Sequence, residues 1–377
     1  MKIVQITPYA MDRPGGVQSH IRDLATWLRL RGHDVRIVAP PGDADVPGLM
    51  TLGACRSVSL HGTRFELTRA RRAELADCVE RLRAWGAEVT HLHTPWTPML
   101  PWQVWRALDL PSVATFHATL PATTGLDPVA WFLRQSAHRF NRHLKAVVVP
   151  SRAPLAQWRA AGADPLPRIL PPAVDLTEWR KAAEQARPGT GLRAIYMGRL
   201  EERKGVAVLL EAWKRVHEER PDARLTIAGS GPEEGLLRNR VIHSNIGGVS
   251  FAPPPDNAAA REMVAAADLF IAPALHGESF GLVLAEAMAA GTVPVAAANA
   301  GFATVLTGAG QGLLVPPGET WPLARRILDL AEHPARLEQM RRWAMSQAQR
   351  FDIATVGPSY EALFAEALGG TRLPNKQ

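Results

Sequence analysis

The sequence predicts an α/β protein made of two doubly wound domains, each with a parallel sheet between layers of helices. The chain has 377 residues, 46% of them hydrophobic and 21% charged, which is typical of a globular protein and long enough for two domains. Short apolar strands alternate with amphipathic helical segments along nearly the whole chain. A proline-rich stretch at residues 165–191 separates two such series and therefore reads as the connection between domains.

The first domain is expected to span residues 1–170. It opens with an apolar strand at 3–7, a Pro-Gly-Gly turn, an amphipathic helix at 17–31 and a second strand at 34–39. A crossover helix of this kind joins parallel neighbouring strands. Further strands are expected at 89–92, 112–116 and 146–150.

The second domain is expected to span residues 171–357 and to repeat the same pattern. Its strands are expected at 194–197, 225–228, 249–251, 269–272 and 293–296. Ligands of such sheets bind at the carboxyl ends of the strands, so two facing sheets predict a binding cleft. A last helix at about 358–377 carries Tyr360, Leu363, Phe364 and Ala367 on one face and is expected to pack back on the first domain.

The sequence argues against a membrane-spanning or secreted protein. No run approaches the roughly 18 consecutive apolar residues of a membrane span. The first six residues read as a strand and not as a cleavable signal. Cys55 and Cys78 are too few for a disulfide framework or a four-ligand metal site. A cytoplasmic protein is expected.

The net charge of +7 is unevenly distributed. Residues 1–180 hold 22 Lys and Arg against 15 Asp and Glu, whereas residues 181–377 hold 21 of each. No acidic residue interrupts the basic residues between 128 and 163. The surplus favours an anionic partner such as a nucleic acid, a membrane surface or a phosphorylated substrate. A solvated surface rich in arginine is the alternative.

Two glycine-containing turns are candidates for binding an anion. Gly15 and Gly16 lie where the first strand is followed by a helix, so that backbone N–H groups can approach an anion closely. The turn matches neither a dinucleotide fingerprint nor a phosphate loop, and a purely structural turn is equally open. In the second domain, Arg199 and Lys204 follow a strand and a glycine and could hold a diphosphate. Exposed cations in a loop are common, which leaves a structural role open here too.

Residues 276–292 carry the strongest signal. Glu278 lies in a glycine-rich loop after an apolar strand, and a helix is expected to begin after Gly281. The N–H groups of Leu282 and Val283 would face a phosphate at the start of this helix, and Glu278 would lie beside it to bind hydroxyl groups. Glu286, two turns along an otherwise apolar helix, could pair with the hydroxyls of a ribose. Helix capping and solvation are the alternatives for both acids.

These segments together resemble family 4 of the retaining glycosyltransferases, which have the GT-B fold: two Rossmann-like domains facing across a cleft. The resemblance rests on residues 278–291 (Glu-Ser-Phe-Gly-Leu-Val-Leu-Ala-Glu-Ala-Met-Ala-Ala-Gly), on the 198–205 segment and on the Pro-Gly-Gly turn. Within the family, Tyr9 and residues 14–20 and 114–117 most resemble the phosphatidylinositol mannosyltransferases.

The resemblance implies a hexosyltransferase. It would move a hexose, with retention, from a nucleotide sugar such as GDP-mannose or UDP-glucose to a membrane lipid such as phosphatidylinositol or diacylglycerol. No metal or other cofactor is implied, in agreement with a sequence that shows neither an Asp-x-Asp segment nor clustered His and Cys ligands. Glu278 and His117 would act in catalysis by contacting the sugar. The implied donor-binding residues are Gly15, Gly16, Arg199, Lys204, Glu278, Ser279, Phe280, Gly281, Leu282, Val283 and Glu286. The implied acceptor-binding residues are Tyr9, Asp12, Gln18 and Arg64.

A basic helix at residues 128–145 is expected to lie at an anionic membrane surface. An apolar stripe of Phe132, Phe140 and Leu144 is bordered by cations, which is typical of such helices. The residues expected to contact the membrane are Trp131, Phe132, Arg134, Arg139 and Arg142. The expected location is therefore peripheral, on the inner face of the plasma membrane. In the alternative, the stripe packs on the sheet and the cations face water.

Three other functions remain open. A non-catalytic subunit could bind a nucleotide sugar, although every motif position expected to be polar is intact. An enzyme of the same fold could act on a soluble sugar or sugar phosphate. A nucleic-acid-binding protein could use the basic half, but no nucleic-acid module accompanies the charge, so no nucleic acid partner is expected. The sequence gives no indication of the oligomeric state.

Overall fold

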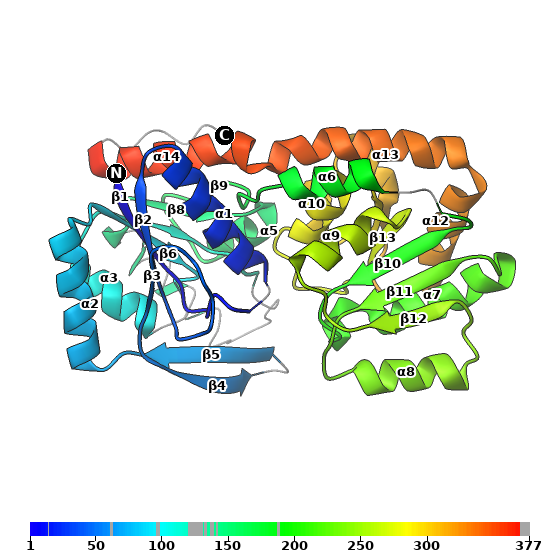
Figure 1. Cartoon of the computed structure of the whole chain (residues 1–377), viewed down its shortest axis with the longest axis horizontal. Helices are drawn as coiled ribbons and strands as arrows, with labels where there is room; N and C mark the ends of the chain where they lie inside the picture. The colour runs from blue at the N-terminus through cyan, green and yellow to red at the C-terminus, as the bar shows by residue number, and fades with distance from the viewer. Residues whose placement is uncertain are drawn as a thin grey trace. The chain divides into compact units, whose positions relative to one another are not determined.

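The computed structural model describes residues 1–13, 15–60, 63–95, 99–119, 131, 134–135, 139–140, 142–186 and 189–369, with the backbone alone for 55–60 and 63–66. The chain forms two compact units, each built on its own parallel sheet (Figure 1). Unit 1 consists of Met1–Val174 and Ile353–Gln377, and unit 2 is Asp175–Asp352. Unit 2 thus ends before 357, because residues 353–357 already belong to the helix that packs in unit 1.

Seven strands form the sheet of unit 1, in the order β3-β2-β1-β6-β7-β8-β9. They are β1 (Lys2–Ile6), β2 (Asp34–Ala39), β3 (Leu49–Thr51), β6 (Val89–His93), β7 (Ser112–Thr115), β8 (Ala146–Val149) and β9 (Arg168–Ile169). All neighbours are parallel, and Ile3 of β1 lies opposite Val35 on one side and Val89 on the other. The central strands are buried along their length because helices cover both faces of the sheet. The strands expected from the sequence are confirmed.

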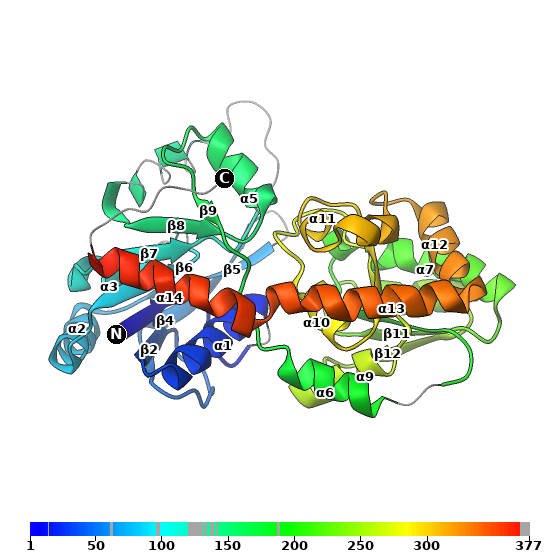
Figure 2. The same cartoon turned by 90° about the horizontal axis from the view of Figure 1, so that it is seen from above.

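Helices α1 (Gly16–Leu30) and α14 (Ile353–Gly369) pack against each other, and α14 also contacts strands β6 and β7 of the sheet (Figure 2). Helices α2 (Arg72–Trp85) and α3 (Leu100–Leu108) pack together elsewhere in the unit, and α5 (Arg152–Ala160) lies against β8. The expected packing of the last helix on the first domain is confirmed, since Tyr360 and Phe364 are buried in the same cluster as Ile21 and Leu24 of α1. A side chain in place of Gly357 would lie 2.8 Å from the Trp27 ring, so glycine permits this close approach.

An antiparallel hairpin, β4 (Ala54–Leu60) and β5 (Thr63–Arg69), forms a separate two-stranded sheet in unit 1. It was not expected from the sequence, and neither were the short edge strands β3 and β9. The edge strands β3 and β9, with three and two residues, are too short to leave a periodic signal in the sequence.

The sheet of unit 2 has the order β12-β11-β10-β13-β14-β15. Its strands are β10 (Arg193–Met197), β11 (Arg224–Ala228), β12 (Val249–Ala252), β13 (Leu269–Ala272), β14 (Val293–Ala297) and β15 (Leu314–Val315). Its helices are α6 (Thr177–Gln185), α7 (Val206–Glu219), α8 (Glu234–His243), α9 (Asn257–Ala265), α10 (Leu282–Ala289), α11 (Phe302–Val305), α12 (Thr320–Glu332) and α13 (Pro334–Ala348), with 3₁₀ turns η1 (Glu202–Lys204), η2 (Gly308–Leu313) and η3 (Gln349–Phe351).

In each sheet the strands that follow the first one in the chain are added on one side of it, and the later strands are added on the other side. The strand order therefore reverses between β1 and β6 in unit 1 and between β10 and β13 in unit 2. Open parallel sheets bind ligands at the carboxyl ends of the strands at such switch points. Both places are therefore candidate ligand sites. Within the described part of the chain, none of the helices combines the length and the apolar character that crossing a membrane requires.

Candidate functional site

In unit 2, two loops leave the carboxyl ends of the adjacent strands β10 and β13. The first carries Arg199 and Lys204 and ends at Gly205; the second runs through Glu278 to α10. The N–H of Leu275 donates to the carbonyl of Arg203 at 2.8 Å and so fastens the loops together. Gly205 has φ +69°, and a Cβ there would lie 2.2 Å from the carbonyl oxygen of Pro273, so a glycine is needed where the loops meet.

The two loops bring together a set of charged side chains, here called the cation–acid cluster: Arg199, Glu201, Arg203, Lys204 and Glu278. Lys204 Nζ donates to Glu278 Oε1 at 2.6 Å, and Arg203 Nη1 lies 3.7 Å from the same oxygen. Glu201 pairs with Arg199 at 2.7 Å and with Arg203 at 3.1 Å. Three cations against two acids leave one positive charge in excess for an anionic ligand.

The structure brings Lys204 and Glu278 together as the resemblance implied, and it adds two residues that the sequence analysis missed. Arg203 and Glu201 lie in the same short segment as Arg199, so their position between two glycines was the signal that could have identified them. Arg199 is more exposed than its neighbours, with 59% of its side chain accessible against 24% for Lys204. The Arg199 side chain can therefore change its rotamer to contact a ligand with a smaller loss of packing than Lys204.

Tyr196 supports the cluster from the core of unit 2 and was also missed. Its hydroxyl donates to the carbonyl oxygen of Arg199 at 2.7 Å. Burial, with the charge of Glu278 as a further cause, raises the pKa of Tyr196 above its ordinary value. The hydroxyl therefore stays protonated and keeps the backbone of the first loop in place.

Helix α10 begins at Leu282, as expected, after Gly281 with φ +104°. The first N–H groups of a helix have no partner within it, so those of Leu282 and Val283 are suited to an anion. Ser279 and Glu286 are both partly buried. The Phe280 ring is buried against Phe351, with ring centroids 5.3 Å apart, which leaves its backbone for any donor contact.

In unit 1, the glycine turn follows β1 as expected. Gly15 is the N-cap of α1, Gly16 is its first residue, and both are exposed. Pro14 lies outside the described residues. The structure thus places an accessible helix N-terminus here, and its binding to a diphosphate stays a prediction.

Three of the four residues expected at the acceptor lie at or near this loop. Gln18 is buried and donates to the carbonyl of Ala10 at 3.3 Å. Asp12 accepts the N–H of Asp43 at 3.3 Å, and Tyr9 is partly buried with its N–H donating to Thr7 Oγ1. Asp12 and Gln18 therefore hold the loop in shape. Arg64 lies on β5 opposite Ser59, and its side chain is outside what the structure describes.

The apolar stripe of the expected membrane helix packs inward, contrary to its expected contact with lipid. Phe140 and Leu144 are buried, and the Phe140 ring packs against Phe116 and Trp102. The alternative, a stripe packed on the protein core, is correct for these two residues. Phe132 lies outside the described residues.

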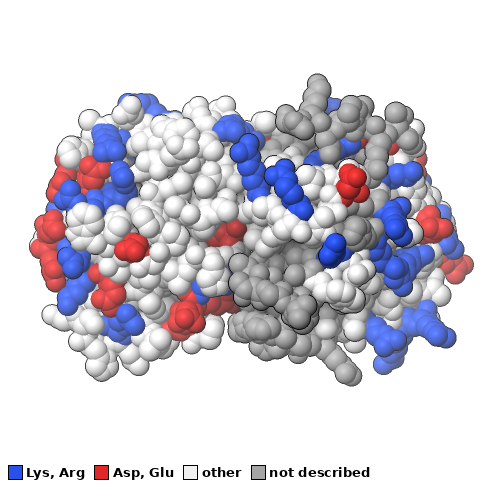
Figure 3. Space-filling view, turned by 180° about the vertical axis from the view of Figure 1, so that it is seen from behind, with Lys and Arg blue, Asp and Glu red and all other residues white. Residues whose placement is uncertain are grey.

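Four of the residues expected at the membrane are exposed: Trp131, Arg134, Arg139 and Arg142. Trp131 has 64% of its surface accessible. On the face shown in Figure 3, basic side chains predominate on one side, with a few acidic side chains among them. Contact of Trp131 and of these three arginines with a membrane stays a prediction.

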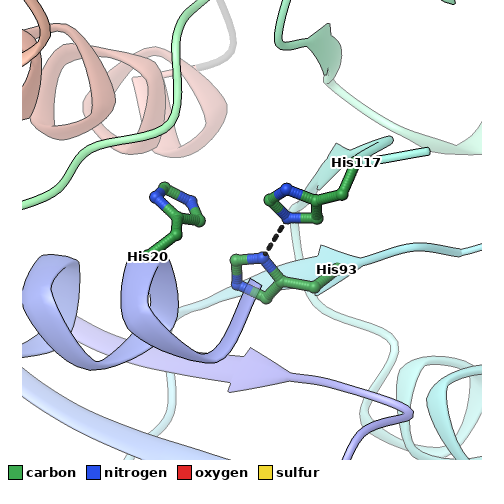
Figure 4. A group of neighbouring side chains, drawn as sticks. All are labelled: His20, His93 and His117. Atoms are coloured by element: carbon green, nitrogen blue, oxygen red, sulfur yellow. Dashed lines mark hydrogen bonds between the residues drawn. The ribbon is translucent and has the colours of Figure 1, made fainter. Parts of the chain in front are cut away.

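Unit 1 also holds a histidine cluster, defined as His20, His91, His93 and His117. Figure 4 shows three of its members, His20, His93 and His117. His20 lies on α1, His91 and His93 on β6, and His117 just after β7. The expectation of no clustered histidine ligands was wrong, because three of these residues come together only when the strands pair. One ring nitrogen each from His20, His93 and His117 lies within 4.8 Å of the others.

All four imidazoles are neutral near pH 7. Burial lowers the pKa of His20 to about 4, and burial together with neighbouring histidines lowers the pKa of His91, His93 and His117 well below the usual value. A hydrogen bond of 3.0 Å joins His93 Nδ1 to His117 Nε2.

The position of the proton in this bond follows from Gln5. Its amide nitrogen donates to the carbonyl of Ile21 at 3.4 Å, so its oxygen accepts from His93 Nε2 at 2.9 Å. Neutral His93 then has a bare Nδ1, and His117 donates to it from Nε2. His117 thus keeps an acceptor at Nδ1.

Comparison with known proteins agrees with this arrangement of two units. Residues 14–178 match the family described as Glycosyltransferase Family 4, and residues 177–347 match Glycosyl transferases group 1. The chain is 33% identical to a phosphatidyl-myo-inositol mannosyltransferase of Mycobacterium leprae over 94% of both chains. It is 29% identical to a D-inositol 3-phosphate glycosyltransferase of Segniliparus rotundus, over 95% of this chain and 86% of that protein.

Solved structures share the fold. HepE of Anabaena, in complex with UDP-glucose, is similar with a TM-score of 0.73 and 19% identity, over 98% of this chain and 100% of that one. The sucrose-phosphate synthase of Thermosynechococcus elongatus is similar with a TM-score of 0.76 and 21% identity, over 98% of this chain and 100% of that one. The chain therefore belongs to the family 4 glycosyltransferases and has their GT-B fold.

Proposed function

We propose that this glycosyltransferase moves a hexose from a nucleotide sugar to a membrane lipid, with retention of configuration and without a metal cofactor. The observation that carries the proposal is the Lys204–Glu278 pair at the carboxyl ends of β10 and β13. Cations for a diphosphate and an acid for sugar hydroxyls meet there, next to the start of α10.

Donor binding would rearrange this pair. A diphosphate oxygen would replace Glu278 as the main partner of Lys204, with Arg199 and Arg203 adding charge. The Glu278 carboxylate would then be available to accept hydrogen bonds from hydroxyl groups of the hexose. Ser279, Gly281 and the N–H groups of Leu282 and Val283 would contact the phosphates, and Glu286 the ribose.

The transfer step would proceed on one face of the sugar. The acceptor hydroxyl oxygen forms its bond to the anomeric carbon as the bond to the diphosphate oxygen breaks, and a diphosphate oxygen takes the hydroxyl proton. The protein's part is to position the reactants and to stabilise the negative charge of the departing diphosphate, which the cations and helix N–H groups do without a metal ion. A contact of His117 with the sugar stays a prediction from the resemblance.

The lipid acceptor is supported by the relatives named phosphatidyl-myo-inositol mannosyltransferase and by the exposed Trp131 and arginines. An anionic membrane surface is accordingly proposed as a partner, with the enzyme peripheral at the cytoplasmic leaflet. A soluble acceptor is the second candidate, since other relatives are named D-inositol 3-phosphate glycosyltransferase and sucrose-phosphate synthase.

The test is a transfer assay with radiolabelled GDP-mannose and UDP-glucose. Each donor is offered with vesicles that contain phosphatidylinositol, with vesicles that contain diacylglycerol, and with soluble inositol 3-phosphate. We expect label in the organic phase with one donor, and we expect Lys204→Ala to abolish it. Lys214→Ala, an exposed lysine on α7, serves as the control. Label only in the soluble inositol 3-phosphate fraction would establish a soluble acceptor. No transfer to any of the acceptors would overturn both the lipid acceptor and the soluble acceptor.

A further inference from the structure

We propose that His20, His93 and His117 form a binding site for a divalent transition metal ion of the zinc, cobalt and nickel group. The ion would not be a cofactor of transfer, so the proposal goes beyond the function above.

The geometry is the first argument. The three side chains come from different elements, α1, the end of β6 and the loop after β7, and Figure 4 shows their rings turned toward a common space. One nitrogen of each lies within 4.8 Å of the others. Nitrogen atoms about 2.0–2.1 Å from a tetrahedral zinc ion lie somewhat over 3 Å apart, so small rotations of the rings suffice.

An unsatisfied nitrogen is the second argument. His20 is completely buried, and its Nε2 has no hydrogen-bond partner among the described residues. The other nitrogen, Nδ1, lies 3.1 Å from the carbonyl oxygen and 2.9 Å from the amide nitrogen of Ala173. Whichever of these two bonds forms, Nε2 keeps an unmatched lone pair or proton in the core, which is costly. A metal ion at Nε2 removes this cost and selects the form with a proton on Nδ1.

The surroundings of the ligands are the third argument. Histidines that bind metals usually donate their other N–H to a carbonyl or carboxylate oxygen, which fixes the ring. His93 has such a partner in the side-chain oxygen of Gln5 at 2.9 Å, and His20 has one in the carbonyl of Ala173. Binding of the ion at His117 Nε2 requires the proton on this nitrogen to move to Nδ1 of the same ring. The hydrogen bond between His93 Nδ1 and His117 Nε2 is then replaced by a bond from each of these nitrogens to the metal ion.

The ligand set determines which ions fit. Three neutral imidazoles suit zinc, cobalt, nickel or copper, whereas magnesium and calcium need oxygen ligands. His117 is only partly buried, so a water molecule can complete the coordination from its side. His91 is not a ligand in this proposal, because the described histidines whose ring nitrogens all lie within 4.8 Å of one another are His20, His93 and His117.

A cobalt titration tests the site on the full chain. Metal-free protein is titrated with Co²⁺, and binding is followed by the visible absorption bands of tetrahedral cobalt and by calorimetry. We expect one ion per chain, displaced by Zn²⁺, and an affinity at least tenfold weaker in His20→Asn and in His93→Asn. Gln5→Leu should weaken binding by about 10- to 100-fold, as for other residues that orient a metal ligand. His91→Asn is the matched control and should bind like the wild type.

The wild-type protein alone can overturn the proposal, so the test stands even where a variant fails to fold. Wild-type protein that takes up no stoichiometric cobalt, or that shows only the spectrum of aqueous cobalt, refutes the site. So does wild-type affinity in a folded His20→Asn protein. We also expect bound Zn²⁺ to inhibit transfer by occupying His117, and this consequence rests on the proposed function. Metal binding in a chain that transfers no sugar would refute the function and leave the site intact.

Discussion

Lys204 and Glu278 are 74 residues apart in the chain and are joined by a hydrogen bond of 2.6 Å between Nζ and Oε1. Their side chains are mostly buried, with 24% and 13% of the surface accessible. Arg203 lies 3.7 Å from the same carboxylate oxygen. Glu278 thus holds two cations in position and competes with any anionic ligand for them.

Glu278→Gln should separate nucleotide binding from transfer. The amide does not compete for the cations, so we expect GDP or UDP to bind as tightly as to the wild type or several-fold more tightly. The rate of transfer should fall at least about 100-fold, because the acid that would hold the sugar in the transition state is lost. Calorimetry and initial rates measure the two effects. A parallel loss of both would contradict the assigned role of Glu278.

Lys204→Ala should weaken the binding of the nucleoside diphosphate at least about tenfold, since a charge-assisted hydrogen bond contributes roughly 1.5–3 kcal/mol. The double variant with Glu278→Gln should show non-additive effects on binding, because the two side chains are in contact. Lys214→Ala should bind like the wild type. Additive effects would mean that the pair does not act as a unit.

Two glycines should respond in opposite ways to substitution by alanine. A Cβ on Gly301 would lie 2.4 Å from the carbonyl oxygen of Glu278, so Gly301→Ala should lower the free energy of unfolding by about 1–3 kcal/mol and reduce transfer. Gly235 on α8 has no atom within 4 Å of its Cβ position. Gly235→Ala should raise the free energy of unfolding by about 0.5–1 kcal/mol. Urea denaturation measures both, and equal effects would count against the close contact at Gly301.

The attachment of α14 to unit 1 should depend on pH through Glu361. His33 Nε2 lies 2.8 Å and Arg31 Nη2 3.4 Å from its carboxylate, and the hydrogen bond from His33 is the main cause that lowers the pKa of Glu361 below 4.5. A carboxylate with a lowered pKa stabilises the fold above its unfolded pKa, and this stability is lost as the pH falls through the folded value. Glu361→Gln should therefore lower the free energy of unfolding by up to about 1 kcal/mol at pH 7.

The difference in the free energy of unfolding between the wild type and Glu361→Gln should become smaller below pH 4.5. Denaturation midpoints over this pH range measure it. A difference that stays constant across the range would show that the ion pair contributes nothing.

Membrane attachment should depend on the exposed arginines. The triple variant Arg134→Ala, Arg139→Ala, Arg142→Ala should partition about 100-fold less into vesicles with anionic lipid, at about 1 kcal/mol for each arginine near the surface. Wild-type binding should weaken with salt and be absent from neutral vesicles. A triple variant of the exposed Arg81, Arg238 and Arg342 is the control. Equal sedimentation of both variants would refute this surface.

Local patterns in the sequence were enough to predict the two parallel sheets, the closing helix and the loops that carry Lys204 and Glu278. Apolar runs of strand length, helical periodicity and glycines at the turns report on each element by itself, and the handedness of the crossover connections then restricts how the elements assemble. The resemblance placed Lys204 and Glu278 at the same donor, whereas their direct contact follows from the pairing of β10 with β13, which the structure shows.

Only the tertiary structure decided which residues far apart in the chain meet. The inward packing of Phe140, the hairpin of β4 and β5, and the support of the first loop by Tyr196 depend on neighbours that no local pattern names. The histidine cluster is the clearest case. The resemblance implied a role for His117 at the sugar, but no local pattern indicated that it meets His20 and His93. Strand pairing and the packing of α1 on the sheet bring the three together. Burial of these side chains then lowers their pKa values, which is a property of the folded interior and not of the sequence alone.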